Sequence, residues 1–194
     1  MAPALLDRYI PQPDVRERFE TTIRAPAALV MQVAAQFDMQ SLPAVRAIIR
    51  LREALLGAQR DAAREPQGIL AETARLGWSV LEQQTGRYVV CGARCQPWLA
   101  DVVFRPIEAR DFAAYAEPDQ VKIAWTIEAE EIAAGVTRFA QETRAITTDA
   151  HSRRRFRRYW RWARFGIVAI RLLLLPAVRR EAQRRWESET GQRE

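Results

Sequence analysis

The stretch from His151 to Phe165, HSRRRFRRYWRWARF, decides how the rest of the chain is interpreted. It contains seven arginines, two tryptophans, two phenylalanines and one tyrosine. Such a composition suits a nucleic-acid groove, a membrane-surface helix or an ordinary amphipathic helix on a protein core. The three alternatives distribute aromatic and basic side chains differently around a helix, so the spacing distinguishes them.

The spacing predicts an amphipathic core helix. At about 100° per residue, the apolar side chains gather on one stripe and the arginines on the opposite arc. The stripe consists of Phe156, Tyr159, Trp160, Ala163, Ile167, Ile170, Leu174 and Ala177. The arc consists of Arg154, Arg157, Arg158, Arg161 and Arg164. A base-stacking surface needs aromatic and cationic side chains together, so this segregation favours a core helix and no specific binding of nucleic acid.

The helix continues into FGIVAIRLLLL, residues 165–175, which is apolar nearly all the way round. A membrane span needs about 20 apolar residues, and this shorter run contains Arg171, so we predict no transmembrane span. We expect the face near Val168, Leu172 and Leu175 to be covered by residues 58–76, by a second subunit in a homodimer, or by lipid in a peripheral membrane contact. We favour the first two covers over lipid. The arginines upstream would suit an anionic membrane surface, but they are just as common on the exposed face of a helix in a globular protein.

Composition and length indicate a globular protein. The chain has 194 residues, of which 48% are hydrophobic and 8 are glycine, and a net charge of +6. Lys122 is the only lysine, and a bias toward arginine this broad weakens any argument from arginine abundance. The N-terminal sequence has no basic segment followed by an apolar run, so we predict no signal peptide and a cytoplasmic protein. We expect one domain over residues 1–194.

The two cysteines predict neither a disulfide nor a metal site. Cys91 and Cys95 lie in a strand-like run, where they would be about 13 Å apart at roughly 3.3 Å per residue. A single histidine and the lack of a second cysteine pair leave a metal short of ligands. We therefore predict buried free thiols, no metal, and no cofactor, since glycine-rich phosphate loops are also missing.

Upstream of the long helix, the patterns predict one strand, two helices and about five further strands. Residues 1–15 contain three prolines and are expected to form an irregular arm. A strand with Phe19 and Ile23 on one face is followed by two helices, the second beginning after Ser41 as N-cap and ending at Gly57. The further strands are predicted at residues 78–84, 87–94, 99–105, 121–130 and 136–147. Asp149 is the predicted N-cap of the final helix, about 150–187.

With this order, the chain resembles the START-like helix-grip superfamily (SRPBCC), which includes polyketide cyclase-like and lipid-transport-like proteins. The resemblance rests on DVRERFETTIRAP, PAALVMQVAAQFD, FAAYAEPDQVKIAW, RFAQETRAITTDA and RRRFRRYWRWARFGIVAIR. The last two stretches are similar to a bacterial subgroup with no assigned reaction. The resemblance implies an α+β helix-grip fold, in which a curved antiparallel β-sheet wraps around a long C-terminal α-helix with two short helices after the first strand.

The superfamily resemblance also implies a cavity between sheet and helix that binds apolar molecules. Strand and helix periodicity independently point a set of apolar side chains inward, either to line that cavity or to fill a core: Phe19, Val89, Trp125, Ile127, Phe139, Tyr159, Trp160 and Ile167. The predicted function is binding of an apolar small molecule or lipid, with no assigned reaction. The alternative is a polyketide cyclase, aromatase or dehydratase.

No catalytic residue can be assigned from the sequence. The enzyme alternative needs a base poised near neutral pH inside the cavity, and besides carboxylates the candidates are Tyr88, Tyr115 and Tyr159. His151 is expected on the helix surface. Glu142 and Arg144, with Glu20 and Arg18 on the neighbouring strand, are predicted to form an ion-pair ladder on a solvated face; their carboxylates would suggest catalysis only if buried.

Overall fold

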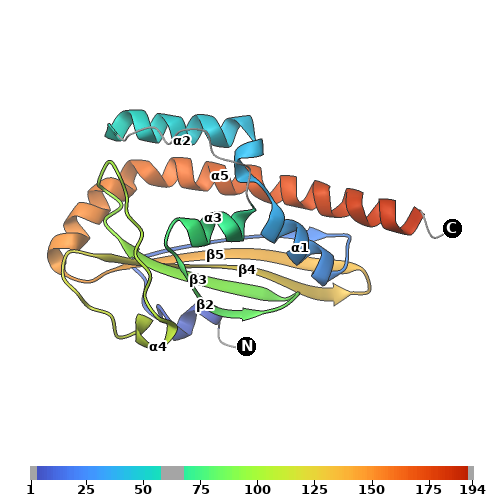
Figure 1. The fold of residues 1–194 in the computed structure, drawn as a ribbon, viewed down its shortest axis with the longest axis horizontal. Helices are drawn as coiled ribbons and strands as arrows, with labels where there is room; N and C mark the ends of the chain where they lie inside the picture. The colour runs from blue at the N-terminus through green and yellow to red at the C-terminus, as the bar shows by residue number, and fades with distance from the viewer. Residues whose placement is uncertain (1–3, 58–67, 192–194) are drawn as a thin grey trace.

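The computed structural model describes residues 4–57 and 68–191, which form a five-stranded sheet covered by helices (Figure 1). The elements in chain order are η1 (Leu5–Arg8), β1 (Val15–Ile23), α1 (Ala27–Gln36), η2 (Met39–Ser41), α2 (Pro43–Leu56), α3 (Ile69–Arg75), β2 (Ser79–Gln84), β3 (Tyr88–Cys95), α4 (Ala109–Phe112), β4 (Val121–Ala133), β5 (Val136–Thr147) and α5 (Ala150–Gly191).

The sheet is antiparallel with the order β1-β5-β4-β3-β2. Because side chains alternate between the two faces of a strand, the register places Phe19, Gln141, Ile127 and Val89 in one row across four strands. We call the face that carries this row the inner face. The opposite, outer face carries Glu142, one residue further along β5.

The long helix α5 runs along the inner face together with α1 and α3, whereas η1 and α4 lie on the outer side (Figure 1). The chain therefore has the predicted α+β helix-grip architecture, a curved antiparallel sheet with a long C-terminal helix and two helices after the first strand. One feature differs from a simple grip: α2 lies on the side of α5 that faces away from the sheet.

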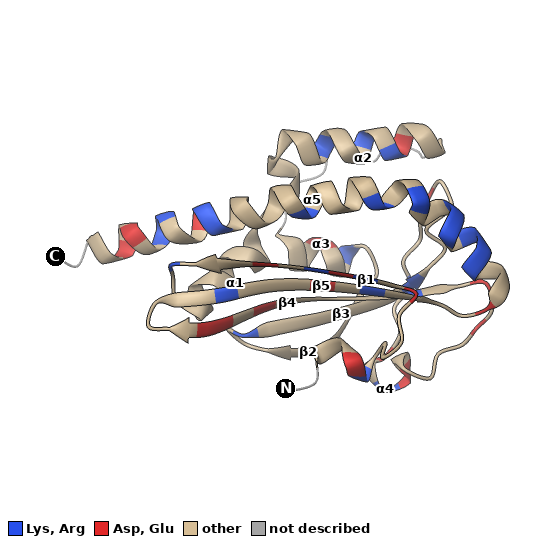
Figure 2. Cartoon of the chain, turned by 180° about the vertical axis from the view of Figure 1, so that it is seen from behind, with Lys and Arg blue, Asp and Glu red and all other residues tan. Residues whose placement is uncertain are grey.

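The start of α5 is as predicted. The backbone N–H of Ser152 donates to Oδ1 of Asp149 at 2.8 Å, and the N–H of Asp119 donates to Oδ2 of the same carboxylate. These backbone donors lower the pKa of Asp149 to about 2. The predicted stripe is buried or half-buried, and the predicted arginine arc is exposed. Figure 2 shows the basic residues concentrated in the first turns of this helix.

The strand predicted at residues 99–105 does not form. Only Arg105 pairs, through two backbone hydrogen bonds of 3.0 and 2.9 Å with Arg94. Pro97 and Pro106 flank the segment and lack the N–H that a strand ladder requires. The sheet consequently has five strands where the patterns predicted six.

The predicted N-cap of the second helix is also wrong, by one residue. Ser41 belongs to η2, where its hydroxyl donates to the carbonyl of Asp38 at 2.6 Å, and Leu42 is the N-cap of α2. The reason is Pro43, whose fixed φ suits the first helical position. The predicted end is confirmed, because Gly57 adopts the left-handed conformation with φ 70°.

Part of the apolar run of α5 is covered by α2, an option that the sequence did not suggest. A Cβ on Gly166 would lie 3.1 Å from Cγ2 of Ile48 in α2, which shows how closely the two helices approach. Leu175 is buried, but Phe165 and Leu172 are 66% and 61% exposed. Residues 58–67 of the proposed cover lie outside the described residues. Within the described ranges, no helix is long and apolar enough to cross a membrane.

Candidate functional site

Five of the eight predicted cavity residues lie together on the inner face. They pack with α1 and with the second half of α5 in a cluster that we call the inner-face cluster. Its members on the sheet include Phe19, Val89, Cys91, Trp125, Ile127 and Phe139, and its members on α5 include Leu174, Leu175 and Val178. Sheet and helix therefore meet here through aromatic and aliphatic side chains.

The inner-face cluster also contains Trp78, which was not among the cavity residues predicted from the sequence. The ring centroid of Trp78 is 6.4 Å from that of Trp125 and 4.8 Å from that of Phe104. Trp78 directly precedes β2, and the loop that carries Phe104 was wrongly predicted to be a strand. The sequence signal for Trp78 was a tryptophan at the start of a predicted strand. Its contact with Phe104, however, depends on the conformation of the loop that carries Phe104.

The other three predicted residues lie nearer the start of α5. Tyr159, Trp160 and Ile167 pack with Phe156 of the same helix and with Val121 and Ala145 of the sheet. The predicted set is thus divided between two clusters along α5. That these residues line a cavity remains a prediction for both clusters.

Gln141 is a buried polar side chain on the largely apolar inner face, which also carries Glu17 and Thr143 on the strands β1 and β5. Gln141 lies between Phe19 and Ile127 in the row across the sheet and is 5% exposed. Its buried Oε1 atom has no hydrogen-bond partner among the described residues. Leaving a buried acceptor unpaired costs about 1–3 kcal/mol, so Gln141 is suited to accept a hydrogen bond from a bound molecule.

The two thiols are free and buried, as predicted. Burial raises the pKa of both Cys91 and Cys95 to about 12. The thiols therefore stay protonated at neutral pH and are poor nucleophiles. Within the described part of the chain, no group of three metal-ligating side chains is assembled.

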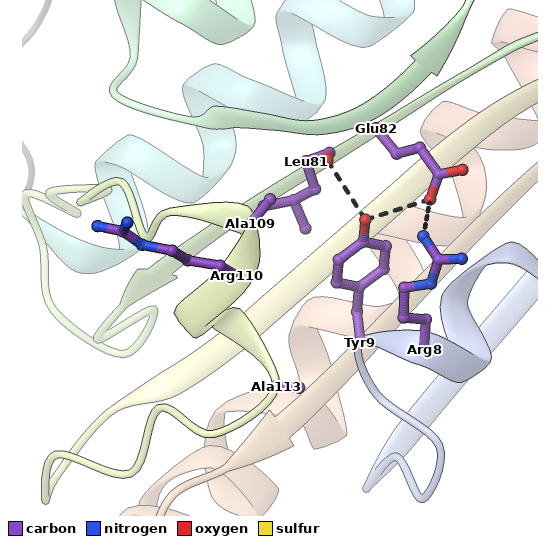
Figure 3. A pocket seen from close by; sticks show the side chains of 7 residues that line it. All are labelled: Arg8, Tyr9, Leu81, Glu82, Ala109, Arg110 and Ala113. Atoms are coloured by element: carbon purple, nitrogen blue, oxygen red, sulfur yellow. Dashed lines mark hydrogen bonds and ion pairs between the residues drawn. The ribbon is translucent and has the colours of Figure 1, made fainter.

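A second, more polar site lies on the outer face between η1, β2 and α4 (Figure 3). This pocket has a volume of about 380 Å³ and is lined by Arg8, Tyr9, Leu81, Glu82, Ala109, Arg110 and Ala113. This pocket was not predicted from the sequence, because its walls come from three segments far apart in the chain.

In this pocket, which we call the outer pocket, Glu82 accepts most of the side-chain hydrogen bonds. It accepts hydrogen bonds from the hydroxyls of Tyr9 and Tyr88 at 3.2 and 2.7 Å and from Nη1 of Arg8 at 3.0 Å. Burial and the nearby Glu82 raise the pKa of Tyr9, while the hydrogen bond to Glu82 is the main cause that raises the pKa of Tyr88. Both tyrosines are therefore held in the protonated form, and the carboxylate accepts from three donors.

Two of the three tyrosines considered as catalytic bases lie on the outer side. Tyr88 and Tyr115 pack against the cluster formed by Leu6, Val90 and Phe112 beneath the N-terminal arm. Burial, followed by the 2.8 Å hydrogen bond to Glu117, raises the pKa of Tyr115 to about 12. Of the three, Tyr159 alone belongs to α5 and packs toward the inner face.

The predicted ion pairs with β1 form, since Arg18 lies 3.0 Å from Glu142 and 3.8 Å from Glu20. The predicted solvation of Glu142 and Arg144 is wrong, because both side chains are buried, at 1% and 2% exposure. Nε of Arg144 lies 2.6 Å from the Glu142 carboxylate, and Nη1 of Arg144 lies 2.7 Å from Asp7 of the N-terminal arm. The arm, expected to be irregular, forms η1 and buries Leu6 and Ile10 at 1% exposure. It therefore covers the face that the strand pattern assigned to solvent.

The buried Glu142 remains ionised despite its position. Burial would raise its pKa, but hydrogen bonds from Arg144, Arg18 and Arg16 outweigh that effect and lower the pKa overall. The distances are 2.9 Å to Nε of Arg16 and 3.0 Å to Nη1 of Arg18. A carboxylate held by three guanidinium groups is a structural anion, and it does not have the raised pKa of a general acid or base.

Comparisons with known proteins identify no family. No family model and no curated protein matches the chain. The Zhui aromatase/cyclase from Streptomyces sp. R1128 is 16% identical, with 88% of this chain and 94% of that chain covered and a TM-score of 0.32. Ara h 8.0201 is 10% identical, with 84% and 98% covered and a TM-score of 0.23. Such low scores carry no argument about function, and the fold assignment rests on this chain's own elements.

Proposed function

We propose that the protein binds an apolar small molecule or lipid between α5 and the inner face of the sheet. The observation that carries the proposal is Gln141, whose buried amide oxygen has no hydrogen-bond partner among the described residues and lies among aromatic and aliphatic side chains. Binding sites for small apolar molecules combine such surroundings with a few polar groups that orient the ligand. We assign Phe19, Val89, Trp125, Ile127 and Phe139 to the site, and Tyr159, Trp160 and Ile167 to its extension along α5.

Binding is proposed ahead of catalysis because of where the titratable groups lie. The inner-face thiols of Cys91 and Cys95 are held protonated by burial. Tyr88 and Tyr115 lie on the outer side, and Glu142 is ion-paired there. The cyclase, aromatase or dehydratase alternative would be supported by turnover of a polyketide-like substrate that depends on Tyr159.

The test uses the tryptophans as reporters. Protein purified from its host should release an apolar molecule in native mass spectrometry. After delipidation, titration with the apolar probe Nile red should change the tryptophan emission of the wild type. The change should be smaller in Trp125→Phe, because that side chain lies in the proposed site, and it should be retained in Trp162→Phe, whose side chain is 39% exposed.

Two results would contradict the proposal. One is a protein that carries no small molecule and whose emission does not respond to the probe. The other is an equal response in Trp125→Phe and Trp162→Phe, which would place the binding elsewhere on the chain.

A further inference from the structure

Arg171 stands out among the charged residues of α5. It is the only charge between Arg164 and Arg179. Residues three, four and seven positions apart share one side of a helix, so Arg171 lies on the same side as Ile167, Leu174 and Val178.

That side of α5 faces the sheet. Ile167 packs in the cluster that contains Ala145 of β5, and Leu174 and Val178 pack in the inner-face cluster. Arg171 therefore lies at the junction of the two apolar clusters, which between them contain every predicted cavity residue.

At residues 171–173 the exposure is the reverse of that on an ordinary surface helix. Arg171 is half-buried, whereas the adjacent Leu172 and Leu173 are 61% and 38% exposed. A helix that only needed to be soluble would place the leucines inward and the arginine outward. The position of Arg171 is thus unfavourable for the folded chain alone.

No carboxylate compensates for this arginine within residues 4–57 and 68–191. Burial alone lowers the pKa of Arg171 to about 10, without an ion pair or hydrogen bond that would raise it. Glu17, which lies on the inner face of β1, makes no ion pair with it. By contrast, Arg153 and Arg155 near the start of the helix pair with Asp14 and Asp119 at 3.2 Å.

From this placement we propose that the ligand is an anionic amphiphile, whose carboxylate or similar acidic group binds to Arg171 while its apolar part lies in the inner-face cluster. The proposal rests on the proposed function and specifies its ligand class. A guanidinium binds a carboxylate through two parallel hydrogen bonds. Gln141, on the opposite wall, supplies a further polar contact.

The experiment compares two ligands that differ only in the head group, dodecanoic acid and dodecan-1-ol, each displacing Nile red from the delipidated full chain at pH 8. The wild type should bind dodecanoate at least about tenfold more tightly than the alcohol, because charged hydrogen bonds are stronger than neutral ones. Arg171→Met should lose that preference and keep its affinity for the alcohol.

Two further variants act as controls. Arg179→Met removes an exposed arginine of the same helix and should leave the preference unchanged. Arg171→Lys retains the charge and should retain part of the preference. Because methionine removes a poorly compensated charge, Arg171→Met should melt no lower than the wild type, and circular dichroism checks that it is folded.

The outcomes separate this inference from the proposed function. If the wild type binds the alcohol as tightly as the acid, or if Arg171→Met keeps the preference, the anionic ligand is refuted while apolar binding stands. If neither amphiphile nor Nile red binds, the proposed function fails and the inference fails with it.

Discussion

At the scale of single residues, Glu142 shows how a carboxylate can be removed from water and remain an anion. Its three partners come from two strands: Arg16 and Arg18 from the neighbouring strand β1, and Arg144 from its own strand β5. Arg144 in turn holds the N-terminal arm through Asp7 and the carbonyl of Ile10. The ion pairs thus connect the edge strand, the strand beside it and the arm.

We expect Glu142→Gln to destabilise the protein by about 3–5 kcal/mol, because it removes the carboxylate that pairs with the buried guanidinium of Arg144. Chemical denaturation at pH 7 measures the change. The exposed Glu130, which pairs with Arg138 at the surface, provides the control: Glu130→Gln should cost no more than about 1 kcal/mol. Equal effects of the two substitutions would show that burial of Glu142 has no energetic consequence.

The pH dependence of stability follows from the direction of the same shift. The folded pKa of Glu142 lies below its ordinary value of 4.5, so the unfolded chain binds the proton more readily. The stabilisation is fully present above about pH 4.5 and is lost as the pH falls through the folded value. Unfolding midpoints between pH 7 and pH 3 should fall more steeply for the wild type than for Glu142→Gln. Parallel curves would contradict the assigned shift.

At the scale of elements, α5 carries two surfaces with different roles. Its sheet-facing side joins the two apolar clusters, while the opposite side is only partly covered by α2 and leaves Phe165 and Leu172 exposed. Contact of these exposed side chains with a second subunit or a lipid surface remains a prediction from the sequence.

We expect Leu172→Glu to abolish such a contact, since the new charge would be desolvated at the interface. The stability of the isolated chain should change by no more than about 0.5 kcal/mol, because the side chain is exposed there. Light scattering measures assembly, and flotation with liposomes measures lipid binding. A wild type that is monomeric and does not float with liposomes would contradict the predicted contact.

At the scale of the whole molecule, the sheet is buried on both faces by unrelated segments. Helices α1, α3 and α5 cover the inner face, and the N-terminal arm with α4 covers the outer face (Figures 1 and 3). The two layers contact opposite sides of the same strands, so changes in one layer should affect the function of the other only through overall stability.

Ile10→Ala tests this separation. Ile10 belongs to the N-terminal arm and is 1% exposed, packed against the outer face of the sheet, and its truncation should cost about 2–5 kcal/mol of stability. Binding of Nile red in the inner layer should be unchanged under conditions where the variant is folded. Leu99→Ala, at a side chain that is 41% exposed, is the matched control and should cost far less. Loss of probe binding in the folded Ile10→Ala protein would show that the layers are coupled.

The sequence by itself determined which side of each element is apolar. Periodicity identified the stripe of α5 and the alternation of β4 and β5, and local chemistry identified Asp149 as an N-cap and Gly57 as a helix end. These are short-range properties, since they depend on backbone geometry and on residues within a few positions. They sufficed for the order of most elements and for five inner-face residues that lie together, whereas the helix-grip architecture was implied by the family resemblance.

What covers each side was decided only by the tertiary structure. Glu142 and Arg144 alternate like residues of a solvated face, yet the arm buries them; Tyr88 and Tyr115 lie on the outer face, and α2 packs on the far side of α5. The outer pocket, and the burial of Arg171 with no ion pair to a described carboxylate, likewise depend on contacts between distant segments. The physical reason is that periodicity specifies the direction of a side chain within its own element, whereas its burial, partners and pKa depend on the element that packs against it.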